Sequence, residues 1–268
     1  MHPMLNIAVR AARAGGSLIA RHIGSADRLQ VESKHPDDLV TNIDRECEQT
    51  VRAVLQKAYR SHAVLGEEGG LTGSPDAEYR WYIDPIDGTT NFIRGLPLVT
   101  VSIGLHHRGR PLAGVVFCPL TNELFTAARG EGAALNGRRI RVGDRDTLEG
   151  SLIATAPPAR YRERMPAYLQ LFARLVDQVA DIRRSGCASL DLCYVACGRY
   201  DGYLEQGLKA WDFAAGEVVL REAGGIITDF MGDNHYTRSG NLLCGNPRMV
   251  QELLTRVCDP PTLAAELR

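Results

Sequence analysis

The sequence predicts a protein of mixed α and β structure, α+β in its first half and α/β in its second. Two observations carry this prediction. Apolar residues recur at helical spacing near the N-terminus, whereas the middle of the chain holds β-branched runs separated by Gly, Pro and Asn. After about residue 150, strand-like and helix-like segments alternate. We therefore expect an antiparallel-sheet half over 1–148 and an α/β half over 149–268, packed as one compact unit.

The first half opens with two predicted helices. Residues 4–20 carry apolar side chains on one helical face, with arginines off that face. A second helix is marked by Thr41 and Asp44, which form a capping-box-like start, and should end near Tyr59. A short buried strand over 63–65 then leads into a glycine-rich turn.

Three runs in the middle of the chain, 98–105, 112–118 and 123–128, predict an antiparallel meander. In the second half the alternating pattern predicts strands and helices in turn. The expected strands are 152–154 and 203–204, and the expected helices are 167–179, 190–196 and 211–223.

The composition is that of an ordinary soluble globular protein, with 44% hydrophobic and 24% charged residues. A formal net charge of -1 gives no broad attraction to nucleic acid or to an anionic membrane. The N-terminus lacks a basic region followed by an apolar run, and no stretch approaches the length of a membrane span, so we expect a cytoplasmic protein. The seven cysteines show no zinc-type spacing.

The most informative segment is the apolar strand that runs into two aspartates, a proline and a glycine. Asp84 and Asp87 are three residues apart across a proline-stiffened turn and can direct two carboxylates at one point. The carbonyl of Ile86 can supply a third oxygen, and hard oxygen ligands favour Mg²⁺ or Mn²⁺ over Zn²⁺. The N–H groups that follow, at the start of a short helix, can bind a phosphate. Either Asp-Pro or Asp-Gly alone is more typical of a surface turn.

A second informative segment has an acidic residue at the start of the expected helix 211–223. As a purely structural residue, Asp212 would be the N-cap of that helix. The small side chains of Ala214, Ala215 and Gly216 suit close packing against another element. Taken alone, this segment has a structural and a functional interpretation of similar weight, and only its combination with the Asp84 segment favours a metal and phosphate site.

Together the two segments resemble the signature motifs of the inositol monophosphatase family, the Mg²⁺-dependent, lithium-sensitive phosphatases. Both occur in the family's order, and the resemblance covers essentially the whole chain. Residues 1–12 and 122–127 are also similar to a bacterial branch of that family. The resemblance implies a layered αβαβα sandwich and a homodimer.

Carried over to this chain, the resemblance implies two or three Mg²⁺ ions, with Mn²⁺ as a substitute and Li⁺ as an inhibitor. Glu67, Asp84 and the carbonyl of Ile86 would hold one ion. Asp87 and Asp212 would hold a second, with Asp84 as the bridge.

The resemblance also implies catalytic roles for Thr89, Asp44 and Glu67. Thr89, oriented by Asp44, would position the attacking water on the ion that Glu67 holds. The N–H groups of Gly88 and Thr89 would bind the phosphate. The structural alternative for Asp44 is a helix-capping carboxylate.

For the alcohol part of the substrate, the resemblance implies contacts with Glu205 and with the turn before the helix 190–196, near Arg183. The structural alternatives are a solvated strand end for Glu205 and a surface charge for Arg183. The full implied set of substrate contacts is Ile86, Asp87, Gly88, Thr89, Arg183, Gly186, Cys187, Ala188, Glu205 and Asp212.

The implied reaction is hydrolysis of a small phosphate monoester such as inositol 1-phosphate by two-metal activation of water. Phosphatases acting on fructose 1,6-bisphosphate, 3′-phosphoadenosine or histidinol phosphate are similar in their metal motifs, and the sequence separates them weakly. The bacterial branch is also associated with ribosomal RNA antitermination through NusA and RNA polymerase. The alternative is therefore an antitermination or ribosome-biogenesis factor that binds these partners through a surface, for example at Arg183 and Arg184, with phosphatase activity secondary.

Overall fold

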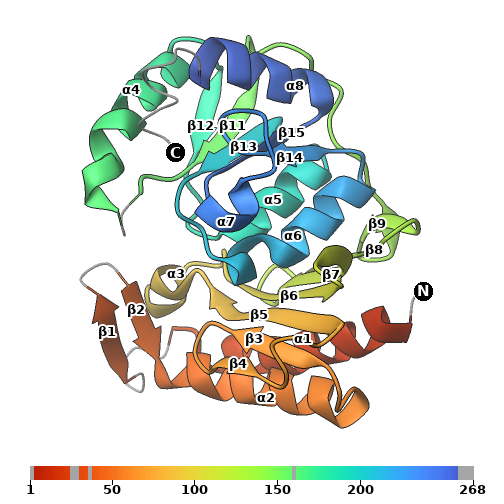
Figure 1. The fold of residues 1–268 in the computed structure, drawn as a ribbon. Coiled ribbons are helices and arrows are strands. Elements are labelled where there is room, and N and C mark those ends of the chain that lie inside the picture. Colours follow the sequence, from red (N-terminus) through yellow and green to blue (C-terminus); the bar gives the residue numbers. More distant parts are fainter. Residues whose placement is uncertain (1–2, 25–29, 36–37, 159–160, 259–268) are drawn as a thin grey trace.

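The computed structural model describes residues 3–24, 30–35, 38–158 and 161–258. The chain forms five stacked layers in which helices and sheets alternate (Figure 1). This arrangement confirms the predicted class of mixed α and β structure and the layered sandwich. The division at residues 148 and 149 into two halves stays a prediction, although the strands of the first sheet end at Arg139 and those of the second begin at Leu152.

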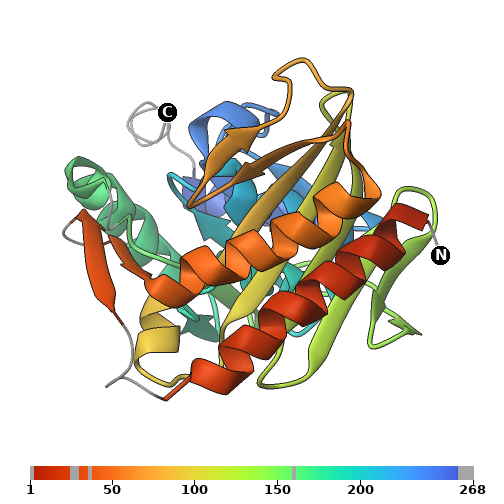
Figure 2. The same cartoon turned by 90° about the horizontal axis from the view of Figure 1, so that it is seen from below.

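The first layer consists of α1 (Pro3–His22) and α2 (Asn42–Ala58), which lie side by side across one face of the large sheet (Figure 2). Both helices were predicted. The side chain of Thr41 accepts a hydrogen bond from the backbone of Ile43, and the Asp44 carboxylate accepts one from the backbone of Thr41, so the expected capping box is confirmed. Buried leucine, isoleucine, valine and alanine side chains join the two helices to the sheet.

The second layer is a sheet of eight strands in the order β10-β9-β8-β7-β6-β5-β3-β4, antiparallel except for the pair β3 and β5. The predicted meander is confirmed as β6, β7 and β8, while β4, β9 and β10 were not predicted. The strands are β3 (Ala63–Gly66), β4 (Gly70–Thr72), β5 (Tyr79–Asp87), β6 (Thr100–His107), β7 (Arg110–Cys118), β8 (Glu123–Ala128), β9 (Gly132–Leu135) and β10 (Arg138–Arg139). A hairpin of β1 (Val31–His35) and β2 (Asp38–Thr41) precedes α2 and was also not predicted.

The middle layer, α5 (Ala188–Ala196) and α6 (Ala210–Glu222), is buried between the two sheets (Figure 1). Helix α6 lies directly on β6 and β7 because glycines there leave room for its backbone. A Cβ atom at Gly104 would approach the backbone of Ala214 to 2.7 Å, and one at Gly114 would approach the oxygen of Ala215 to 2.4 Å. The small-residue face expected on this helix thus packs closely, and it fixes the start of α6 beside the end of β5.

The fourth layer is a five-stranded sheet in the order β12-β11-β13-β15-β14. It is mixed, because β11 pairs in parallel with β12 and β13, whereas β15 pairs antiparallel with β13 and β14. The strands are β11 (Leu152–Thr155), β12 (Asp181–Arg183), β13 (Gly202–Glu205), β14 (Ile226–Thr228) and β15 (Leu242–Gly245). The outer layer and its connections contain η2 (Arg162–Arg164), α4 (Met165–Val176), α7 (Tyr236–Ser239), α8 (Pro247–Glu252) and η3 (Leu253–Cys258).

The layers bring the ends of β3, β5 and β13 to one place, together with the short helix α3 (Thr89–Ile93) and the N-termini of α5 and α6. Within the described residues, no helix is both long and apolar enough to cross a membrane.

Candidate functional site

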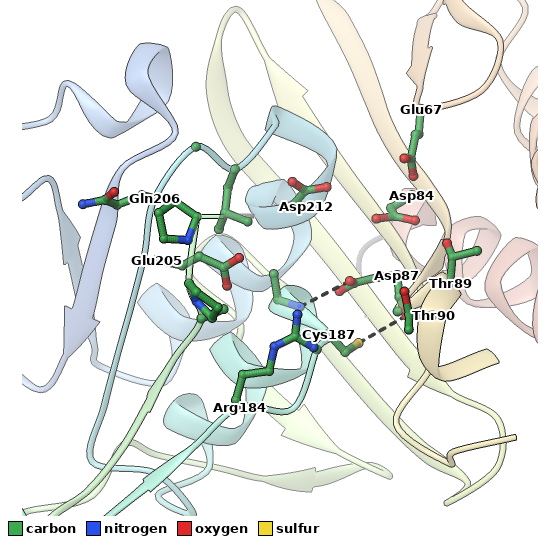
Figure 3. Close-up of a pocket in the computed structure, with 18 of the residues that line it drawn as sticks. Glu67, Asp84, Asp87, Thr89, Thr90, Arg184, Cys187, Glu205, Gln206 and Asp212 are labelled. Atoms are coloured by element: carbon green, nitrogen blue, oxygen red, sulfur yellow. Dashed lines mark hydrogen bonds between the residues drawn. The ribbon is translucent and has the colours of Figure 1, made fainter. Parts of the chain in front are cut away.

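A cavity of about 180 Å³ lies between the two sheets at the meeting point of these elements (Figure 3). Most residues singled out from the sequence line it. The predicted residues at its wall are Glu67, Asp84, Ile86, Asp87, Gly88, Thr89, Gly186, Cys187, Ala188, Glu205 and Asp212. The residues at its wall that were not among the predicted site residues are Leu39, Thr90, Ala156, Pro157, Pro158, Tyr161, Arg184, Gln206, Gly207 and Leu208. Arg184 was considered from the sequence only as part of a partner-binding surface.

The end of β5 is irregular, and this irregularity places two aspartates at the cavity. Asp84 pairs with Ser102 and Asp87 with Thr100, so three steps along β5 match two along β6. Pro85 has no N–H group for the ladder, which favours such a bulge at this point. The N–H of Ile86 donates to Asp84 at 3.1 Å and fixes the side chain.

The carboxylate of Asp87 is held by the N-terminus of α5. It accepts hydrogen bonds from the N–H of Ala188 at 3.2 Å, from the N–H of Ser189 at 2.7 Å and from the Ser189 hydroxyl at 2.6 Å. Unpaired N–H groups and the helix dipole favour an anionic group here. Ser189 also bonds to Thr100 at 2.7 Å. Ser189 was not among the predicted site residues, although a serine near the start of an expected helix is a capping signal.

Glu67 lies in the turn after β3, and a pair of charged residues on α2 holds this turn. The Glu48 carboxylate accepts from the N–H groups of Glu68 at 2.7 Å and Gly69 at 2.8 Å. Arg52 donates to Glu48 at 2.7 Å and to the carbonyl of Gly70 at 2.6 Å. Glu48 and Arg52 were not predicted to support the site, because their i,i+4 spacing on the predicted helix was the only signal in the sequence.

Asp212 reaches the cavity from the first turn of α6, opposite Asp84 (Figure 3). The expectation that it is the N-cap was wrong. The helix begins two residues earlier than Asp212, and the carboxylate accepts a 2.7 Å hydrogen bond from the N–H of Lys209, the actual N-cap residue. Asp212 therefore still satisfies a backbone donor at the helix start, from the third helical position.

Four carboxylates thus face a shared space, and their burial is costly without compensation (Figure 3). Asp84 is only 3% exposed, and Asp87 and Asp212 are each 8% exposed. Burial, with the nearby charges of Glu67, Asp87 and Asp212, raises the pKa of Asp84 well above its usual range. Burial also raises the pKa of Asp87, against the hydrogen bonds from Ser189 that lower it. Such an all-oxygen anionic set fits a hard divalent cation such as Mg²⁺.

Behind this cluster, Thr89 and Asp44 form a hydrogen-bonded pair as the resemblance implies. The Thr89 hydroxyl lies 3.1 Å from an Asp44 oxygen and 3.1 Å from the carbonyl oxygen of Ile86, so its proton has two acceptors. Asp44 does not line the cavity. Burial raises its pKa to about 6, although hydrogen bonds from Thr41 and Thr89 lower it. Asp44 is therefore both the expected capping residue and the partner of Thr89.

The opposite wall carries Glu205 at the end of β13, whose carboxylate accepts a 2.5 Å hydrogen bond from the hydroxyl of Tyr203. The selection of Arg183 needs correction. On the edge strand β12, its side chain is 47% exposed and pairs with Asp181 at 2.5 Å, and it does not line the cavity. Arg184 lines the cavity instead, because successive residues at a strand end point in opposite directions (Figure 3).

Comparison with known proteins gives one consistent result over nearly the whole chain. The model of the "Inositol monophosphatase family" matches residues 1–260. The chain is 50% identical to the Nus factor SuhB of Pseudomonas aeruginosa, over 98% of this chain and 99% of that protein.

Solved structures agree with this result. The extragenic suppressor protein suhB from Bartonella henselae superposes with a TM-score of 0.92 at 41% identity, covering 96% of this chain and 98% of that one. An inositol monophosphatase from Anabaena (Nostoc) sp. PCC 7120 gives a TM-score of 0.85 at 36% identity, with 97% of each chain covered.

Proposed function

The chain belongs to the inositol monophosphatase family, and from this premise we propose that it is a Mg²⁺-dependent phosphatase that hydrolyses inositol 1-phosphate to inositol and phosphate. The observation that carries this proposal is that the buried side chains of Asp84, Asp87 and Asp212 and the half-buried Glu67 line one cavity. Their mutual repulsion has no structural benefit of its own, and cations would relieve it.

Glu67, Asp84 and the Ile86 carbonyl would hold one Mg²⁺ ion, and Asp84, Asp87 and Asp212 would hold another. When bound, such ions neutralise the charge of a phosphate dianion and lower the pKa of water. The protein itself contributes by holding the ligand side chains in place. The turn at Glu67 is braced by Glu48, and the hydrogen bonds of Asp87 and Asp212 fix their orientation before any ligand arrives.

Thr89 would orient the attacking water. Its hydroxyl proton is directed at Asp44 or at the carbonyl of Ile86, so the lone pairs of its oxygen can accept a hydrogen bond from that water. The N–H groups of Gly88 and Thr89 would bind the phosphate oxygens. Because α3 has only five residues, these N–H groups would contribute more than the dipole of the helix.

On the alcohol side, Glu205 would accept hydrogen bonds from substrate hydroxyls. Tyr203 already occupies one of its oxygens and fixes the carboxylate in place. A carboxylate in this position favours a polyol over an apolar alcohol, because an apolar group would displace water from the carboxylate without replacing its hydrogen bonds. Related sugar or nucleotide phosphates are the rival substrates.

A panel of phosphomonoesters tests the proposal. With Mg²⁺ present, inositol 1-phosphate should give a higher kcat/KM than fructose 1,6-bisphosphate, 3′-phosphoadenosine compounds or histidinol phosphate, and Li⁺ should inhibit the turnover. If the enzyme prefers one of the other compounds, that compound is the substrate and not inositol 1-phosphate. Absence of turnover with every compound in the panel would contradict the proposed phosphatase activity.

A second role is favoured by the relatives named Nus factor SuhB, to which this chain is similar along its whole length. We propose that the chain also forms a homodimer and binds NusA and RNA polymerase through a surface outside the cavity. Capture of these two proteins by the Asp87→Asn variant would support a role separable from catalysis. Failure of both wild type and variant to bind purified NusA and polymerase would contradict it.

A further inference from the structure

Tyr161 lines the cavity, and no motif in the sequence marked it. Its ring packs tightly against the backbone of Gly207, where an added Cβ atom would lie only 2.3 Å from Cε2 of the ring. The guanidinium carbon of Arg164 stands 4.5 Å from the ring centroid. The ring is therefore fixed between a glycine that leaves room for it and a cation that stabilises it.

A buried amide ties the two neighbours of the ring together. The side-chain oxygen of Asn241, which is 1% exposed, accepts from the N–H of Gly207 at 3.0 Å and from Arg164 at 3.0 Å. Because Arg164 and Gly207 are fixed to one atom, the position of the Tyr161 ring between them is fixed as well.

The hydroxyl of Tyr161 accepts a 2.9 Å hydrogen bond from the ammonium of Lys209. Lys209 is also the residue whose N–H holds the carboxylate of Asp212, so one residue connects Tyr161 with the acidic cluster. An ammonium can only donate, which leaves the tyrosine's own proton to be donated elsewhere. Among the described residues, no acceptor for this proton is present. The ammonium also polarises the hydroxyl and strengthens it as a donor.

We propose that Tyr161 determines substrate specificity by donating a hydrogen bond to a hydroxyl group of the alcohol part of the substrate. Glu205 supplies an acceptor and Tyr161 a donor at the same wall. Together they select a cyclic polyol phosphate with several hydroxyls over a phosphate ester of an apolar alcohol. This inference deepens the proposed phosphatase function and rests on it.

The test compares two substrates that differ only in hydroxyl groups, inositol 1-phosphate and cyclohexyl phosphate, on wild type and Tyr161→Phe with Mg²⁺. The ratio of kcat/KM for inositol 1-phosphate to that for cyclohexyl phosphate should fall about tenfold in the variant, the contribution of one hydrogen bond. The fall should appear mainly as a higher KM for inositol 1-phosphate. A merely structural role of the ring would lower kcat for both substrates and leave the ratio unchanged.

Two further variants sharpen the result. Lys209→Met removes the ammonium but keeps the backbone bond to Asp212, and it should lower the same ratio. Tyr79→Phe removes a hydroxyl from β5 outside the cavity and should leave the ratio at its wild-type value. An active wild type with an unchanged ratio in Tyr161→Phe would overturn this inference alone. A wild type that hydrolyses neither substrate nor any other phosphomonoester would overturn the proposed function and this inference with it.

Discussion

The hydroxyl of Ser189 donates a 2.6 Å hydrogen bond to the carboxylate of Asp87 and thereby joins the start of α5 to the end of β5. A second hydrogen bond of 2.7 Å continues from Ser189 to Thr100 on β6. These bonds connect a helix of the middle layer with two strands of the eight-stranded sheet. The orientation of a predicted metal ligand therefore depends on the packing of these two layers.

Replacing Ser189 by Ala should weaken this orientation without removing any predicted ligand. We expect the Mg²⁺ concentration needed for half-maximal activity to rise several-fold and the free energy of unfolding to fall by about 1 kcal/mol. Activity as a function of Mg²⁺ concentration measures the first effect, and urea unfolding measures the second. Ser151→Ala is a matched control, because Ser151 is a buried serine that bonds to the carbonyl of Leu148 outside the cavity. An identical Mg²⁺ response in the two variants would refute the role of Ser189.

Asp84→Asn should stabilise the metal-free protein while abolishing turnover. The substitution removes one charge from a buried cluster of like charges, and an amide oxygen can still accept from the N–H of Ile86. We expect the Tm in EDTA at pH 8 to rise, by roughly 2–4 °C for each kcal/mol gained. Mg²⁺ should raise the Tm of wild type but not that of the variant. A variant that is less stable than wild type in EDTA would argue against electrostatic repulsion at this site.

The pKa of Asp44, raised by burial to about 6, predicts a pH-dependent stability difference. Between the ordinary carboxyl pKa of 3.8 and this value, the folded state binds a proton that the unfolded state does not. The contribution of Asp44 to the free energy of unfolding therefore falls as pH rises through this window. The lowered pKa of His106, about 4, acts in the opposite direction, so wild type alone is not informative.

The difference between wild type and Asp44→Asn isolates this effect. In EDTA, the stability of the variant relative to wild type should be greater at pH 8 than at pH 5, by on the order of 1.4 kcal/mol, because pH 5 lies only one unit below the raised pKa. Unfolding by urea at the two pH values measures it. Equal differences at both values would show that Asp44 ionises normally.

Variants of Thr89 distinguish the contribution of its hydroxyl to activity from that of its methyl group. Thr89→Ser keeps a hydroxyl within reach of Asp44 and should retain most of the activity. Thr89→Val keeps the shape but removes the hydroxyl, and should lower kcat by about 10²–10³-fold with little change in KM. Steady-state kinetics on inositol 1-phosphate checks both. Comparable activity of the Val and Ser variants would contradict the proposed orientation of water.

Residues adjacent in the sequence, or marked by helix caps, were predictable before the structure. The Thr41 and Asp44 capping box and the apolar strand that runs into Asp84 and Asp87 follow from local patterns, and the structure has both. Local patterns also placed Asp212 at the start of its helix, although it is the third helical residue and not the N-cap. Propensity and capping act over a few residues, so such features are visible in one stretch of sequence.

The parts that were missed depend on contacts between distant segments. Glu48 binds a turn twenty residues away, and Tyr161 reaches the cavity only because Gly207 and Lys209 meet it from another strand-to-helix connection. The choice between Arg183 and Arg184 required the register of an edge strand, and a shift of one residue reverses the side-chain direction. The periodicity of apolar residues does not reveal contacts between distant segments, and a strand as short as β12 is too short for it to show the register.

The central claim is that the four carboxylates bind Mg²⁺ for phosphate ester hydrolysis, and the release of inorganic phosphate from inositol 1-phosphate over a Mg²⁺ titration tests it most directly. Wild type should show saturable, EDTA-sensitive turnover. Asp87→Asn, which keeps the shape of the side chain, should lose at least about 100-fold of this activity while its circular dichroism spectrum stays native. Turnover that is independent of Mg²⁺, or near-wild-type activity of Asp87→Asn, would contradict the account.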